Sequence, residues 1–217
     1  MEITWLGHSC FRIKGREAVI ITDPYDESLG YSLSTPRANI LTISHHHPGH
    51  SYAAGVRGDP FIVDGPGEYE VQDVLITGIS TFHDPERGKE RGKNTVYLIE
   101  VDGIEVCHLG DLGHVPSAEQ VEEMGRVDVL LVPVGGVSTI DAALAAETVR
   151  LLEPKLVIPM HFQTQALEKM RLDPLGNFLR EMGAKDNPPL PKIVVSGSSL
   201  PQGTQAVVLD YHTQGSL

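Results

Sequence analysis

The chain has 217 residues, of which 41% are hydrophobic and 21% are charged, a mixture typical of a folded globular protein and not of a disordered or fibrous one. This length suits one hydrophobic core, and no serine-rich or charged linker interrupts it, so we predict a single domain over residues 1–217. The formal net charge of -12 repels nucleic-acid phosphates, and we expect no nucleic-acid partner.

The chain begins with the strand-like sequence MEITWLG, and neither a signal-peptide pattern nor an apolar run near the ~20 residues of a membrane span is present. We therefore expect a cytoplasmic protein with no membrane partner. Cys10 and Cys107 lie in apolar segments, which predicts buried free thiols. The sequence leaves the oligomeric state open.

In chain order, short apolar segments separated by Gly, Pro, Asp and Asn turns come first. They predict strands over 2–6, 10–14, 17–22, 39–43, 60–63, 73–77, 94–101 and 104–109. Asp102 and Gly103 form the turn of a hairpin between the last two. We expect this half of the chain to be mainly antiparallel sheet.

After residue 111 the pattern changes to helices over 117–124, 140–152 and 175–182 and strands over 127–134, 155–160, 192–196 and 205–211. Ser117 with Gln120 predicts a capping box, Asp173 followed by Pro174 predicts an N-cap and first helical residue, and Gly183 predicts a helix stop. The pattern indicates a layered α/β (α+β) architecture, and it leaves open whether the sheets are stacked or continuous.

The stretch ISHHHPGHS places four histidines directly after the apolar strand that ends at residue 43. His45 and His47 can point to one side of an extended chain, His50 can return to them after a turn, and His46 would point away. Imidazole is the commonest protein ligand for zinc and other first-row metals. The stretch therefore predicts a metal site.

Four further polar residues follow apolar runs in the same way: Asp23, His83, Asp111 and His161. Each could be an ordinary turn residue. Because layered α/β folds build sites from the ends of several strands, the four together favour one constellation with the histidine stretch.

These residues carry a resemblance over nearly the whole chain to small single-domain metal-dependent hydrolases of the metallo-β-lactamase fold. The chain is similar in particular to those related to the ascorbate-6-phosphate lactonases and to uncharacterised Zn-dependent hydrolases. The matching elements are GHS at 7–9, DP at 23–24, HHHPGH at 45–50 for the family's H-x-H-x-D-H, His83, HLGD at 108–111, and VIPMHFQT at 157–164 within the closing helix and strand from 141.

The resemblance implies a four-layer αββα sandwich with a metal site at the edge between its sheets. It implies Zn, with Mn, Ni or Fe as substitutes, as one or two ions held by His45, His47, His50, His83, Asp111 and His161. A metal-bound hydroxide would attack the substrate, and Asp111 and His50 would be catalytic. Asp23 would orient a metal ligand by a hydrogen bond without binding the metal itself.

Gly49 departs from this pattern, because the family has an aspartate there that binds the second metal. That site should therefore be weakened. The chain could be a one-metal hydrolase, or it could bind two ions with His46, His114 or a substrate oxygen as the missing ligand. As an alternative, it could be a catalytically inactive ligand-binding or interaction module.

The expected substrate is a small metabolite, phosphorylated in the sharper interpretation, with an ester, lactone or phosphodiester bond. His8 and the basic loop from Arg87 to Lys93 are candidates for holding its anionic group. The segment after the histidine stretch is short and rich in Gly and Pro, which predicts a reshaped cleft wall. The fold alone does not identify the substrate, because related folds host many chemistries.

Overall fold

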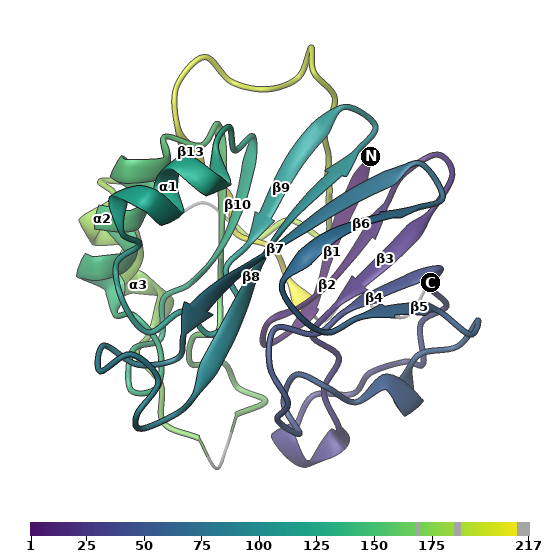
Figure 1. The fold of residues 1–217 in the computed structure, drawn as a ribbon. Coiled ribbons are helices and arrows are strands. Elements are labelled where there is room, and N and C mark those ends of the chain that lie inside the picture. Colours follow the sequence, from purple (N-terminus) through teal and green to yellow (C-terminus); the bar gives the residue numbers. More distant parts are fainter. Residues whose placement is uncertain (168–169, 185–187, 212–217) are drawn as a thin grey trace.

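The structure is a computed structural model that describes residues 1–167, 170–184 and 188–211. Two β-sheets form its centre (Figure 1). In spatial order the six-stranded sheet contains β12 (Ile193–Val194), β1 (Glu2–Gly7), β2 (Cys10–Lys14), β3 (Val19–Thr22), β4 (Ile40–Thr42) and β5 (Phe61–Val63). The seven-stranded sheet contains β13 (Gln205–Ala206), β11 (Leu156–Met160), β10 (Val129–Pro133), β9 (Ile104–His108), β8 (Lys93–Val101), β7 (Val74–Phe82) and β6 (Gly67–Val71).

The main hydrophobic core joins the two sheets, so they are stacked. It contains Ile20 and Ile40 from the six-stranded sheet with Val96 and Leu130 from the seven-stranded sheet, all fully buried. Side chains alternate between the faces of a strand. The neighbouring residue Ile21 accordingly points to the opposite face of its sheet, where it joins a second apolar cluster.

The strand directions follow the predicted pattern with one addition. Antiparallel pairing links β1, β2 and β3, and also β6, β7, β8 and β9. In contrast, β3, β4 and β5 pair in parallel within the half that we expected to be mainly antiparallel. Parallel neighbours need a crossover connection, and residues 23–39 supply one between β3 and β4.

Three α-helices, α1 (Ala118–Met124), α2 (Ala142–Leu152) and α3 (Leu175–Glu181), lie on the outer side of the seven-stranded sheet (Figure 1). The predicted capping box of Ser117 and Gln120 is present. The N-cap prediction for Asp173 is wrong, because Pro174 takes that position without a side-chain cap, while the Asp173 N–H donates to the Gly135 carbonyl. None of the helices in the described parts of the chain has the length and apolar character of a membrane span.

The outer face of the six-stranded sheet is covered differently. In the described residues this layer consists of loops with the 3₁₀ helices η1 (Glu27–Leu29) and η2 (Ala53–Gly55). Tyr25, Tyr31 and Leu33 from these loops pack in the second apolar cluster, which also includes Leu41 of β4. The two stacked sheets of the expected sandwich are thus confirmed, and in the described part of the chain loops with two 3₁₀ helices form its fourth layer.

The strand pattern missed β6 and the second half of β7. β6 is largely exposed and lies at the edge of its sheet, so it lacks the apolar alternation of a buried strand. In β7, Gly78 resembles a strand break in the sequence, yet the strand continues to Phe82. A Cβ at Gly78 would lie 2.6 Å from the Gly65 carbonyl oxygen, so the glycine allows another backbone segment to pack against the strand.

The segments with site residues all leave the ends of strands. His8 follows β1, Asp23 follows β3, and the histidine stretch follows β4 after two residues. In the other sheet, His83 follows β7, His161 follows β11, and Asp111 lies three residues beyond β9. The two sheets therefore deliver these side chains to one edge of the sandwich.

Candidate metal centre

Asp111 lies at the centre of the histidine cluster. Its Oδ2 atom lies 3.2 Å from His50 Nε2, 3.2 Å from His83 Nε2 and 3.4 Å from His161 Nε2. These four residues come from segments after β4, β7, β9 and β11. The structure therefore brings together residues that are far apart in the sequence.

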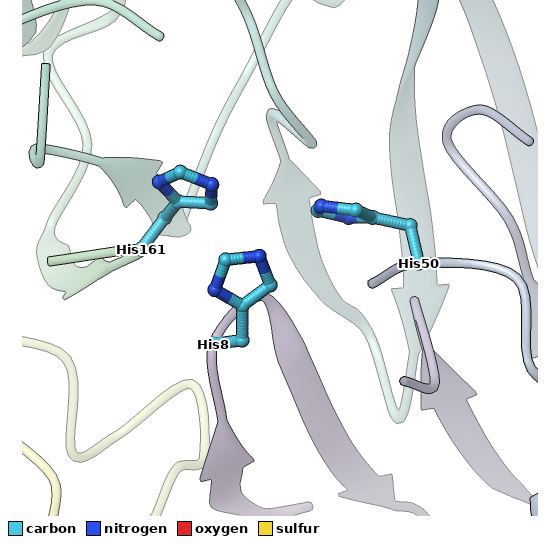
Figure 2. Close-up of side chains that lie close together, drawn as sticks. All are labelled: His8, His50 and His161. Carbon is cyan, nitrogen blue, oxygen red and sulfur yellow. The ribbon is translucent and has the colours of Figure 1, made fainter. Parts of the chain in front are cut away.

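The ligand-type side chains around Asp111 can be divided into two groups. The inner group is His8, His50 and His161, whose rings surround a common space (Figure 2). The outer group is His45, His47 and His83. His45 offers ligand atoms within 4.8 Å both of His47 and His50 and of His83 and Asp111. The site thus has enough donors near Asp111 for one or two ions.

The backbone of the inner group is fixed at the strand ends. His8 and His161 have positive φ angles of 51° and 52°, a left-handed conformation that is uncommon for non-glycine residues and concentrates at functional sites. The His8 carbonyl accepts hydrogen bonds from Trp5 Nε1 at 2.9 Å and from the His161 N–H at 3.2 Å. The two strand ends are therefore linked directly.

Asp23 orients histidines of both groups. Its carboxylate accepts the Ser44 N–H at 2.7 Å and the Ser44 hydroxyl at 2.6 Å, and it lies 2.9 Å from His50 Nδ1. Since the hydroxyl proton goes to Asp23, Ser44 Oγ accepts from His45 Nδ1 at 3.0 Å. Both imidazoles then carry their proton on Nδ1 and leave the Nε2 lone pair for a metal.

Asp111 is held by Asn94 of β8. The Asp111 N–H donates to Asn94 Oδ1 at 2.9 Å, while Asn94 Nδ2 donates to Thr81 Oγ1 and to the Leu109 carbonyl. Gly110 has a φ of +57°, and a Cβ there would lie 2.5 Å from Asn94 Oδ1. A side chain at this position would therefore displace the amide that positions Asp111.

Asp84 organises the loop after His83. Its two carboxylate oxygens accept the backbone N–H groups of Glu86, Gly88, Glu90 and Arg91. Arg91 in turn donates from Nη2 to the Val137 carbonyl at 3.4 Å. One buried carboxylate thus holds a loop that begins at a candidate metal ligand and ends at a guanidinium on the site.

The charges of the cluster match metal binding. Burial, with the nearby His161 and His50, holds the pKa of His8 well below its usual range, and burial lowers that of His45 to about 3. Burial also opposes a charge on His50, but Asp111 and Asp23 raise its pKa to about 10. Without a metal, His50 is therefore protonated on both ring nitrogens, and a metal ion bound at Nε2 would replace the Nε2 proton.

The residues present fit a first-row metal ion. Asp111 Oδ1 is buried without a hydrogen-bond partner among the described residues. Such atoms are uncommon in native proteins and call for an explanation such as an ion. The donor set of imidazoles with one carboxylate suits zinc and related ions.

All eight residues that the sequence singled out for the site lie in this cluster or against it. His47 is exposed, and its Nδ1 accepts the Gly49 N–H at 3.1 Å. The two other histidines proposed as replacement ligands are outside the cluster around Asp111, although His46 lines the same cleft. His46 is exposed, with Nε2 3.9 Å from Asp64, and both ring nitrogens of His114 lie within hydrogen-bond distance of backbone groups.

Sequence reasoning missed Ser44, Asn94 and Asp84, which position the site without belonging to the histidine pattern. Ser44 directly precedes His45 after a buried strand, and this adjacency is a signal that could have identified it. Asn94 and Asp84 have no comparable signal, because their partners become neighbours only in the folded chain.

The histidines open into a cleft of ≈ 360 Å³ that is also lined by Arg91, Ser138 and Met170. This volume is at the lower end of the range for small-molecule sites. A larger cleft of ≈ 510 Å³, lined by Arg12, Arg37 and Arg57, contains no such ligands. The chemistry of the lining residues, and not the volume, therefore identifies the site.

Comparisons with known proteins agree with this geometry. Residues 2–161 match the Beta-lactamase superfamily domain. A solved Thermotoga maritima structure, assigned to the Zn-dependent hydrolases of the metallo-beta-lactamase superfamily, is 40% identical with a TM-score of 0.79 over 96% of this chain and 97% of that chain. A UPF0173 metal-dependent hydrolase from Thermococcus onnurineus is 29% identical, with 76% of this chain and 85% of that protein covered. A UPF0173 protein from Pyrococcus abyssi is 31% identical, with 76% of this chain and 84% of that protein covered.

Proposed function

Since the chain belongs to the beta-lactamase superfamily, as a metal-dependent hydrolase, we propose that it cleaves an ester, lactone or phosphodiester bond in a small anionic metabolite. A phosphorylated substrate is the preferred case. The observation that carries the proposal is that the Asp111 cluster and the Arg91 side chain line one cleft. The family supports an enzyme over the non-catalytic alternative raised by Gly49.

The metal ligands in this proposal are the outer group, Asp111 and the inner residues His50 and His161. Zinc is the preferred ion, with Mn, Ni or Fe as substitutes. Such an ion supplies Lewis-acid chemistry, which lowers the pKa of water and stabilises developing negative charge on oxygen. In this proposal Asp111 and His50 are the catalytic residues, and Asp23 keeps the imidazoles of His45 and His50 oriented through its hydrogen bonds.

Arg91 supports an anionic substrate because, among the described residues, it is the one Lys or Arg that lines the cleft. Its guanidinium can form two parallel hydrogen bonds with a carboxylate or phosphate. The competing acid, Glu90, lies 3.3 Å away, and both side chains are substantially exposed. Because exposed ion pairs are weak, a substrate anion can replace Glu90 at Arg91.

Hydrolysis of paired substrates tests the proposal. The zinc-loaded protein should be assayed with small esters, lactones and phosphodiesters, each in a neutral form and in a form with a carboxylate or phosphate. We expect turnover that prefers the charged form. Arg91→Ala should raise KM for the charged substrate by about 10- to 100-fold, as lost charged hydrogen bonds would, and leave the neutral substrate unchanged.

Lys89→Ala is the matched control, because Lys89 belongs to the same loop but is not among the residues that line the cleft. It should leave both KM values unchanged. Absence of turnover with zinc, manganese, nickel and iron would overturn the proposed reaction. If Arg91→Ala raises KM equally for charged and neutral substrates, the proposal of an anionic substrate is overturned, whereas the proposed hydrolysis stands.

A further inference from the structure

Gly49 marks a ligand position without a side chain. It is buried between His47 and His50 in the histidine stretch. A Cβ built on Gly49 would lie 3.2 Å from His47 Nδ1, 3.3 Å from Leu29 Cδ1 and 3.5 Å from His8 Nε2. The space that a longer side chain at this position would enter is therefore already bordered by an imidazole from another part of the chain.

His8 delivers that imidazole from the turn between β1 and β2. Its ring centroid lies 4.2 Å from that of His161 and 4.9 Å from that of His50. Figure 2 shows the three rings around a common space, each with a ring nitrogen toward it. All three residues have only 1% of their surface exposed. His8 is thus a buried member of the cluster at the base of its cleft, which His50 and His161 line as well.

We propose that His8 Nε2 is a metal ligand of the inner group and replaces the side chain that is absent at Gly49. With Asp111 it completes a set of three imidazoles and one carboxylate oxygen, the number of protein ligands typical of a closed tetrahedral site. This inference rests on the proposed function only in taking the chain to bind metal. It requires neither turnover nor a particular substrate.

Two alternatives for His8 fit the structure less well. A purely structural buried imidazole has no need of two further ligand-type imidazoles around it, whereas ligand atoms of His8, His50 and His161 all lie within 4.8 Å of one another. A group that holds the substrate anion would need a positive charge near the opening of the cleft. His8 is almost fully buried, and its ring packs against those of His161 and His50.

The replacement changes which metals the inner group prefers. An imidazole in place of an aspartate removes one negative charge and one oxygen donor from the site. Nitrogen donors favour zinc and nickel, whereas manganese and magnesium favour carboxylate oxygen. The proposal therefore includes a selective preference of the inner group for zinc over manganese.

Zinc titration of the metal-free full-length protein, by calorimetry and by metal analysis after gel filtration, tests the proposal without any substrate. We expect two ions per chain in the parent. His8→Ala should retain one of them and lower the affinity for the other by more than about 100-fold. This loss exceeds the one expected from removing a residue that only hydrogen-bonds to a metal ligand. His46→Ala removes an exposed imidazole from the same cleft and should bind zinc as the parent does.

A swap variant tests the shared space directly. His8→Ala combined with Gly49→Asp restores a carboxylate next to the room that the imidazole leaves. We expect this double variant to regain the second ion and to bind manganese more tightly relative to zinc than the parent. Unchanged zinc stoichiometry and affinities in His8→Ala would overturn the proposal.

Diffraction at the zinc absorption edge from crystals of the zinc-loaded parent gives a result that does not depend on how a variant folds. The expected result is an ion about 2.0–2.1 Å from His8 Nε2. A structure in which zinc binds the other ligands and does not contact His8 would overturn the inference. If zinc binds through His8 but no substrate is cleaved, the proposed reaction fails while the inference on His8 stands.

Discussion

The inner and outer groups share Asp111, but they differ in how the fold holds them. The inner histidines are each 1% exposed, and the carbonyl of His8 is linked by hydrogen bonds to Trp5 and His161. In the outer group His47 is exposed, His45 is half-buried, and His83 begins a loop organised by Asp84. His8 and His161 are thus fixed at linked strand ends, whereas His45 and His47 lie in the more exposed part of a loop.

This difference assigns different roles to the two sides of one site. A group held by packed strand ends is preorganised and binds metal with little rearrangement. A group with an exposed ligand can adjust when a substrate enters. We therefore expect the outer side to face the substrate and the inner side to be the more rigid metal site, and four substitutions test this comparison.

Asp111→Asn should have the largest effect, because Asp111 is the shared element of both groups. Losing its charge should weaken metal binding at both by more than about 100-fold, beyond the range for residues behind a ligand. Metal content and hydrolysis should fall together. Asp64→Asn, a neutralisation of an exposed carboxylate near His46, should change neither. Loss at only one group would refute the shared role.

Asp23→Asn should have the next largest effect. An amide keeps the shape of Asp23 but can no longer accept from both His50 Nδ1 and Ser44 in the same way. We expect metal affinity to fall about 10- to 100-fold, with the inner group affected more because His50 contacts Asp23 directly. At saturating metal, a hundredfold loss removes about 2.7 kcal/mol of metal-dependent stabilisation, which thermal unfolding with and without zinc measures.

Ser44→Ala separates the two groups. It removes the hydroxyl between Asp23 and His45 but leaves the bond between Asp23 and His50 intact. The outer group should lose up to about tenfold in zinc affinity, and the inner group should keep its affinity. Ser198→Ala, in the loop between β12 and β13, is the matched control. An equal loss at both groups would show that they are not independently supported.

Asp84→Asn should have the smallest effect, confined to the loop after His83. The amide can accept through one oxygen only, so some of the four backbone N–H groups lose their acceptor. We expect faster amide hydrogen exchange over residues 86–91 and a modest rise in KM for anionic substrates through Arg91. Exchange near His8 and His161 should stay as in the parent. Faster exchange there would contradict the separation of the groups.

The two groups also differ in how far the sequence predicted them. The outer pair His45 and His47 belongs to one local stretch, so their convergence follows from two-residue alternation after a buried strand. In the inner group, the sequence predicted His50 and His161 as ligands and His8 as a candidate for holding the substrate, and it gave no sign that His8 lies next to Gly49. Its proximity to Gly49 arises from the packing of the β1–β2 turn against the histidine stretch, which no local pattern contains.

The fold, like the site, was predictable from the sequence only where local patterns determine it. All three helices lie within two residues of their predicted bounds, and the capping box of Ser117 and Gln120 marks the start of the first as predicted. The edge strand β6 was missed because an exposed strand needs no apolar alternation. The loops that cover the six-stranded sheet also follow from tertiary packing, since Tyr25 and Tyr31 lie in no regular strand or helix yet are buried.

By itself, the sequence determined which residues are available to the site: histidines and aspartates where strands end, and a glycine where a carboxylate was expected. It could do so because strand ends and residue types are local properties. Only the tertiary structure decided which imidazole lies next to Gly49, that Asp23 serves both groups, and that Arg91 shares the cleft. These relations depend on how the two sheets stack, and stacking is set by the core as a whole.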